Sequence, residues 1–365
     1  MRRDQFPVAD RLIYMNHAAV APLPRVAAEA MQRFATDALE WGSWHYSEWL
    51  DSYEGVRRSM ASMVNATPAE IALTKNTSEG IATVAMGIDW RAGDRIVCFE
   101  EEFPANVYPW LRLERQGVKI TWARATDSLD SLDEKIRGAR LVALSFVQFL
   151  TGYRADLNAI GKICKDRGAF FFVDAIQGLG VFPLDVRAAN IGAFAADGHK
   201  WLLGPEGCAV LFVAKEWQDA IEPVEVGWTN FEGFDKYQGR TSVLRPDAGR
   251  YENGSLNTIG CYGLRASLDL ILDIGVANIS AKVQALGDRL AEGAVRKGYE
   301  VLGHRTPTTG AGIVSVRKSG IDATELNTQL KQNQVTSAAR MGWLRLSPHF
   351  YLEPEEIDRV VGYLP

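Results

Sequence analysis

Short apolar runs alternate with amphipathic segments through the first two thirds of the chain. Mostly apolar segments occupy 95–99, 141–147 and 169–173, and the last of these has five apolar residues in a row. An uninterrupted apolar run of this length is typical of a strand covered on both faces. Residues 156–167 have the periodicity of an amphipathic helix. The alternation predicts a mostly parallel sheet with helical crossovers, and hence an α/β fold.

The pattern changes after about residue 258. Two long helical segments are expected at 259–274 and 276–297, and the strands near 313–316 and 343–347 are of the antiparallel type. We therefore predict an N-terminal arm, a large domain and a smaller C-terminal α+β domain, over residues 1–24, 25–258 and 259–365. Within the large domain, the helical pattern after residue 25 is interrupted by closely spaced aromatic residues, a density that favours packing, here at a dimer interface.

Composition excludes several classes of function. The 365 residues carry a net charge of −5, which provides no basic surface for nucleic acid or an anionic membrane. No apolar stretch approaches the length of a membrane span, and the N-terminus lacks the apolar core of a signal peptide. The four cysteines are widely spaced, which argues against a metal site and favours reduced thiols in the cytoplasm.

Lys200 is the first candidate for chemistry. It lies between the apolar run 191–196 and the Gly-Pro-Glu-Gly turn at 204–207, at the expected C-terminal end of a buried strand. A lysine held there can form a Schiff base with a carbonyl group, and pyridoxal 5′-phosphate (PLP) is the commonest such carbonyl. A solvated lysine in a glycine-rich turn is the alternative.

Asp174 ends the apolar run 169–173, which reads as a central strand. A buried carboxylate requires a positive partner, and the protonated ring nitrogen of PLP would be one. Asp174 precedes Lys200 by 200 − 174 = 26 residues, enough for one crossover and the next strand.

Four motifs together resemble the class V aminotransferase family of fold-type I PLP enzymes, which includes cysteine desulfurases, isopenicillin N epimerase and kynureninase. They occur in the family's order, at 76–80, 173–177, 198–200 and 345–348. The resemblance implies a fold-type I architecture, PLP as cofactor, an amino acid as substrate and a homodimer with shared active sites. Lys200 and Asp174 would be the catalytic residues.

The resemblance also implies a set of cofactor contacts in addition to Asp174 and Lys200: Thr77, Ser78, Phe103, Gln177, His199 and Ser255. Thr77 and Ser78 open a helix, whose free first-turn amides suit a phosphate, although simple capping is the alternative. Phe103 would stack on the cofactor ring. Ser255 would reach the phosphate of the other subunit's cofactor, with capping of the next helix as its alternative.

Substrate contacts are expected from both ends of the chain. Arg345 stands in an alternating strand pattern, and a guanidinium is a natural clamp for an α-carboxylate. Asn16 and His17 are further candidates, with shaping of a turn as the alternative. The roles of Asp197 and Gln148 stay open, and so does that of Trp228.

The reaction is predicted less directly than the cofactor. Residues 332–341 contain no cysteine, whereas persulfide-forming desulfurases place one shortly before the arginine strand. We therefore expect an enzyme that forms a Cα carbanion, an aminotransferase in the first place, and not a persulfide-type cysteine desulfurase. The alternatives are an epimerase or racemase, a C–S or β-elimination lyase, and a non-catalytic PLP-binding module.

Overall fold

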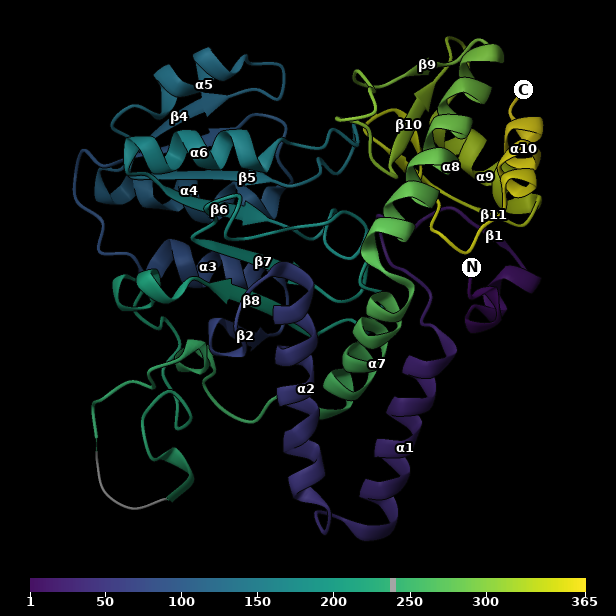
Figure 1. Ribbon diagram of the computed structural model, residues 1–365. Helices are drawn as coiled ribbons and strands as arrows, with labels where there is room; N and C mark the ends of the chain where they lie inside the picture. Colours follow the sequence, from purple (N-terminus) through teal and green to yellow (C-terminus); the bar gives the residue numbers. More distant parts are fainter. Residues whose placement is uncertain (237–240) are drawn as a thin grey trace.

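The computed structural model describes residues 1–236 and 241–365, and a seven-stranded sheet forms its larger part (Figure 1). The strand order is β2-β8-β7-β6-β5-β3-β4. β8 pairs antiparallel with both neighbours, and the other pairs are parallel. This confirms the predicted mostly parallel sheet. The strands are β2 (Ile71–Thr74), β3 (Arg95–Phe99), β4 (Lys119–Ala123), β5 (Leu141–Ser145), β6 (Phe170–Asp174), β7 (Ala193–Asp197) and β8 (Ala209–Val213).

Helices cover this sheet, as the alternating pattern requires. They include α3 (Thr77–Gly87), α4 (Tyr108–Arg112), α5 (Leu129–Ile136) and α6 (Leu157–Arg167). Gly80 explains how closely α3 approaches the sheet, because a Cβ atom there would lie 2.7 Å from Ala195 Cβ on β7. This close approach brings the N-terminus of α3 next to the end of β7.

A second, antiparallel sheet lies beside the first, in the order β12-β13-β10-β9. Its strands are β9 (Glu300–Val301), β10 (Val314–Arg317), β12 (Ala338–Arg340) and β13 (Trp343–Leu346), and its helices are α8 (Val276–Arg296), α9 (Ala323–Gln332) and α10 (Pro354–Tyr363). The N-terminal arm joins this part, because β1 (Ile13–Tyr14) pairs with β11 (Val335–Thr336). This separate antiparallel sheet, beside a mostly parallel one, is the architecture that the sequence predicts.

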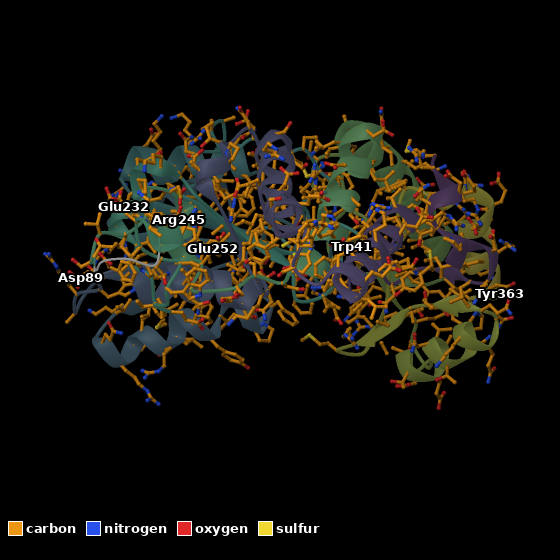
Figure 2. All side chains as sticks on the ribbon, turned by 90° about the horizontal axis from the view of Figure 1, so that it is seen from below. Trp41, Asp89, Glu232, Arg245, Glu252 and Tyr363 are labelled. Atoms are coloured by element: carbon orange, nitrogen blue, oxygen red, sulfur yellow. The ribbon has the colours of Figure 1, made fainter. Side chains whose placement is uncertain are left out.

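A helical hairpin of α1 (Arg25–Trp41) and α2 (Tyr46–Val64) projects from the molecule and packs against α7 (Thr258–Ile274) (Figure 1). Figure 2 places Glu232, Arg245 and Glu252 together towards one end of the molecule and Tyr363 at the opposite end. The division after residue 258 stays a prediction, because α7 packs on both helices of the hairpin. Short 3-10 helices lie at Arg3–Gln5, Pro7–Asp10, Pro68–Glu70, Pro104–Asn106, Leu113–Gln116, Lys215–Ala220, Phe234–Lys236 and Ala248–Tyr251.

No single helix of the described chain is long and apolar enough to cross a membrane. α7 and α8 reach the required length and hydropathy only as a pair, which is bent by 83°.

Candidate active site

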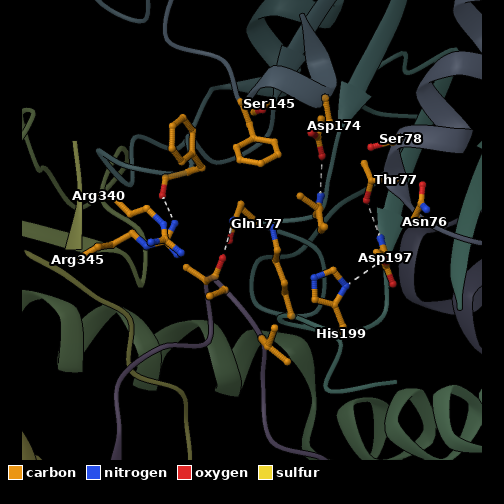
Figure 3. Close-up of a pocket in the computed structure, with 18 residues that line it drawn as sticks. Asn76, Thr77, Ser78, Ser145, Asp174, Gln177, Asp197, His199, Arg340 and Arg345 are labelled. Atoms are coloured by element: carbon orange, nitrogen blue, oxygen red, sulfur yellow. Dashed lines mark hydrogen bonds and ion pairs between the residues drawn. The ribbon is translucent and has the colours of Figure 1, made fainter. Parts of the chain in front are cut away.

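A cavity of about 410 Å³ opens at the carboxyl ends of the large sheet's strands, facing the second sheet (Figure 3). This edge of an α/β sheet is where such folds bind ligands. The cavity brings together most of the residues that the sequence predicts: Thr77, Ser78, Phe103, Asp174, Gln177, His199, Lys200 and Arg345.

Lys200 is positioned by a tight loop that follows β7. Leu203 N donates to Lys200 O over 3.0 Å, and Leu203 itself adopts a left-handed conformation with φ of 58°. Ser267 Oγ fixes this turn by donating to Leu203 O over 2.7 Å. Burial lowers the pKa of the Lys200 amine to about 8, against the opposing attraction of Asp174, although the residue as a whole is only partly buried. At neutral pH about one tenth of the amine is therefore unprotonated, and able to act as a nucleophile.

Asp174 ends β6 and is 2% exposed. Burial raises the pKa of its carboxyl to about 6, while a hydrogen bond from Ile176 N and the charge of Lys200 act in the opposite direction. The cost of burying this carboxylate would fall if a cation faced it within the cavity. A protonated ring nitrogen would meet that requirement.

The start of α3 forms one end of the cavity. Asn76 caps the helix, because its Oδ1 accepts a hydrogen bond from Glu79 N over 2.9 Å. Thr77 Oγ1 accepts from Asp197 N over 2.9 Å, and the exposed Ser78 follows it. The remaining first-turn amides and these hydroxyls can bind an anion such as phosphate.

His199 and Asp197 lie beside this end. Nδ1 of His199 is 3.1 Å from Oδ2 of Asp197, but the two groups are not aligned for a hydrogen bond. Asp197 Oδ1 is also buried without a hydrogen-bond partner. Two polar groups thus face the cavity with unused hydrogen-bonding capacity, as expected beside a polar ligand.

Phe103 supplies an aromatic face. It is 46% exposed, and the Lys200 amine lies 5.7 Å from the centroid of its ring. Phe149 supports the ring edge-on, with the two centroids 5.3 Å apart. An exposed phenylalanine so close to a lysine leaves a flat apolar surface for a ligand ring.

Arg345 enters the cavity from β13 of the second sheet. Its side chain is buried, Nη1 donates to Phe149 O over 2.8 Å, and Nε has no hydrogen-bond partner. Burial lowers the pKa of the guanidinium to about 10, with a further contribution from the charge of Arg340. A buried guanidinium with an unused donor is suited to bind a carboxylate.

Two predicted substrate contacts, Asn16 and His17, do not line the cavity. His17 is fully buried, Nδ1 bonds to Ser347 O over 2.8 Å, and Nε2 bonds to the Tyr351 hydroxyl over 2.9 Å. Burial lowers the pKa of His17 to about 4. Because both ring nitrogens are occupied, we correct the expected role of His17 to packing. Asn16 forms a bridge with Ser347, and its Oδ1 is buried without a hydrogen-bond partner.

Ser255 lies outside this cavity, in a separate one between α2 and residues 228–256. Gln177 lines the active-site cavity, but its amide is engaged on both sides, by Ala18 O at 3.0 Å and Trp201 Nε1 at 2.7 Å. Gln148, whose role the sequence left open, accepts hydrogen bonds within its own turn from Leu150 N and Thr151 N.

Arg340 and Ser145 line the cavity although sequence reasoning assigned them no role. Ser145 ends β5, and its amide donates to the Glu102 carboxylate over 2.6 Å. Burial raises the pKa of Glu102 to about 7. Arg340 lies within residues 332–341, and the signal for it would have been a hairpin predicted at that place.

These residues fit PLP. The structure provides a partly deprotonated lysine, a buried carboxyl that requires a cation, a helix start for the phosphate and an aromatic face for the ring. PLP, when bound, supplies an electron sink for negative charge that develops at the substrate Cα.

Comparison with known proteins agrees with this geometry. The family model "Aminotransferase class-V" matches residues 13–360. A probable cysteine desulfurase from Pyrococcus abyssi is 30% identical, over 99% of this chain and 96% of its own. The apo structure of a cysteine desulfurase from Thermococcus onnurineus superposes with a TM-score of 0.90, at 27% identity over 99% of this chain and 95% of its own. A C-DES variant with glycine linked covalently to its PLP cofactor has a TM-score of 0.92, at 24% identity over 99% and 98% of the two chains.

These relatives correct the expected reaction. The sequence argument favoured an aminotransferase and excluded a persulfide-type cysteine desulfurase because residues 332–341 contain no cysteine. The expectation is wrong, since relatives that cover nearly the whole chain, among them the Pyrococcus abyssi and Thermococcus onnurineus proteins, are named as cysteine desulfurases. The position of one loop cysteine was a poor criterion for the reaction, whereas the resemblance to the family and the fold-type I architecture are confirmed.

The electrostatic coupling of Lys200 and Asp174 predicts a pH effect in the apo-protein. The Asp174 carboxylate raises the pKa of Lys200, so Asp174→Asn should lower that pKa further below about 8. The rate of covalent PLP attachment, followed by absorbance from pH 6 to 10, should therefore reach its half-maximum at a lower pH than in the wild type. Asp197→Asn is the matched control. It should lower the midpoint pH by a smaller amount, because Asp197 contributes less than Asp174 to the pKa of Lys200. An unchanged or higher midpoint in Asp174→Asn would contradict the assigned coupling.

Proposed function

The chain belongs to the class V aminotransferase family of PLP-dependent enzymes, and we propose that it acts on cysteine and cleaves its C–S bond, as a cysteine desulfurase does. The convergence of Lys200, Asp174 and Arg345 in one cavity carries this proposal. The names of the relatives that span the whole chain supply the choice of substrate.

In this proposal one side of the cavity binds the cofactor and the other side binds the substrate. On the side of the large sheet, Thr77 and Ser78 bind the cofactor phosphate together with the helix amides, and His199 contributes from the neighbouring loop. Phe103 covers the cofactor ring, and Gln177 lies beside it. On the side of the second sheet, Arg345 binds the α-carboxylate of the substrate and so fixes the position of its Cα.

Two ionisable residues handle the protons. Asp174 would keep the ring nitrogen of a bound cofactor protonated, because a buried carboxylate stabilises a facing cation. Lys200 would hold the cofactor through its amine and, when that amine is free, would accept the proton from the substrate Cα. A pKa near 8 suits both tasks, since the amine can gain and lose a proton near neutral pH.

The acceptor of the sulfur is a thiol outside the described cavity lining, which contains no cysteine. Cys98, Cys164, Cys208 and Cys261 are buried elsewhere. Burial raises the pKa of Cys164 to about 12 and that of Cys98 still further, which makes both poor nucleophiles at neutral pH. An assay must therefore supply a small thiol.

We also propose that the protein is a homodimer with shared active sites. Leu39 and Trp44 near the tip of the helical hairpin are 84% and 78% exposed, and Trp41, Tyr46 and Leu50 nearby in the sequence are exposed as well, so we treat these five apolar residues as the apolar patch of the hairpin. A patch of this kind is typical of a protein interface. The placement of Ser255 outside the cavity of its own chain supports the role that the resemblance gives it, a contact with the other subunit's cofactor phosphate.

The activity is tested with the holoenzyme, L-cysteine and dithiothreitol as the sulfur acceptor. The enzyme should release alanine, and Lys200→Ala should lose the yellow colour and at least about a hundredfold in rate, because the cofactor attachment and the base are removed together. Lys162→Ala, an exposed lysine on α6, is the control and should keep both. Release of pyruvate and ammonia without alanine, or an undiminished rate in Lys200→Ala, would contradict the proposal.

The dimer is tested by light scattering after size exclusion. The wild type should have about twice the chain mass of 40.3 kDa. Leu39→Asp should shift the protein towards the monomer, because it places a charge in the apolar patch. Val295→Asp introduces the same charge at an exposed apolar site on α8 and should leave the mass unchanged. A monomeric wild type would refute the dimer, and a Leu39→Asp protein with unaltered mass would refute the hairpin tip as its interface.

A further inference from the structure

Arg340 is held at the cavity by the geometry of a β-hairpin. It is the last residue of β12, and a two-residue turn, Met341-Gly342, leads into β13. Both turn residues have positive φ, 50° and 79°, as two-residue hairpin turns require. The register pairs Ala338 with Arg345, so these two residues share a face of the hairpin. Arg340 follows Ala338 by two residues and therefore lies on the same face. Figure 3 shows the Arg340 and Arg345 side chains next to each other, both directed towards the cavity.

No acidic side chain in the described part of the chain forms an ion pair with either arginine. Arg340 donates only to the carbonyl of the neighbouring Ala339, over 3.0 Å, and Arg345 donates to Phe149 O. The charge of Arg340 contributes to lowering the pKa of Arg345, so the two guanidinium groups disfavour each other. Two like charges facing one cavity without counter-ions favour the binding of anionic groups.

The acidic residues of the cavity lie at its other side. In Figure 3, Asp174 and Asp197 lie with Thr77 and Ser78, across the cavity from the two arginines. Asp174 faces Lys200, and Asp197 is paired with His199. A cofactor phosphate bound at the start of α3 would also be far from the arginines. Neither these carboxylates nor that phosphate would neutralise Arg340.

One substrate carboxylate suffices for Arg345, because a guanidinium binds a carboxylate through two parallel hydrogen bonds. Arg340 is then free to bind a second anionic group. Because Arg340 is exposed whereas Arg345 is buried, this second group would lie towards the mouth of the cavity, at the end of the substrate side chain.

We infer that Arg340 selects substrates whose side chain carries a second acid group, such as cysteine derivatives that bear a carboxylate beyond the sulfur. The inference rests on the proposed function, in which Arg345 binds the α-carboxylate. It adds a specificity-determining residue that discriminates by side-chain charge at the rim of the cavity.

The test compares two ligands that differ only in charge, S-carboxymethyl-L-cysteine and its neutral amide, S-carbamoylmethyl-L-cysteine. Their dissociation constants for the PLP-loaded protein are measured by absorbance titration, which requires no turnover. The wild type should bind the acid about threefold to fivefold more tightly than the amide, and fivefold corresponds to the upper range for one partly exposed ion pair. Arg340→Gln should abolish this preference, and Arg340→Lys should keep part of it.

Arg345→Gln is the matched variant. It should raise the dissociation constants of both ligands by a similar factor, because both carry the α-carboxylate. Equal affinity of the wild type for the two ligands would overturn the inference, and so would a preference that persists in Arg340→Gln. The proposed function and the selectivity of Arg340 can be refuted independently. If the protein prefers the acid through Arg340 but forms no alanine from cysteine, the desulfurase reaction is refuted and the selectivity of Arg340 stands.

Discussion

The site depends on the electrostatic attraction between the Lys200 amine and the Asp174 carboxyl group, both of which are largely removed from water. Burial raises the pKa of Asp174 to about 6 and lowers that of Lys200 to about 8, and the attraction between the two limits both shifts. The pair comes from consecutive parallel strands, β6 and β7, whose carboxyl ends meet at one edge of the sheet. The end of β6 and the loop after β7 therefore bring the two groups to one cavity. The rest of the cavity adds recognition around this pair.

Recognition is divided between the two sheets. The large sheet supplies the start of α3 and the ring of Phe103, and the second sheet supplies Arg345 and Arg340 from one hairpin. In the proposed function a substrate would bind across the boundary between the sheets, with its Cα between Arg345 and Lys200. The N-terminal arm reinforces this boundary, because β1 pairs with β11 and Gln177 donates to Ala18 O.

Much of this arrangement could be predicted from the sequence. The buried runs at 141–147 and 169–173 and the polar residues that follow the strands indicated the sheet and its reactive edge, since periodicity and strand ends are local signals. His17 and Arg340 could not be assigned in the same way. His17 is satisfied by Ser347 and Tyr351, which are more than 300 residues away along the chain, so its burial is a tertiary property. Arg340 depends on a Met-Gly turn, which is not a typical hairpin sequence. The reaction was predicted wrongly because it was inferred from one absent cysteine.

The central claim is that Lys200 holds PLP opposite Asp174, and the most direct measurement of it is covalent trapping. The holoenzyme is reduced with borohydride and digested, and the peptides are sequenced by mass spectrometry. The account predicts a single phosphopyridoxyl group, on the peptide that contains Lys200, and its loss in Lys200→Ala. A label on any other lysine, or a reduced protein without a label, would contradict it.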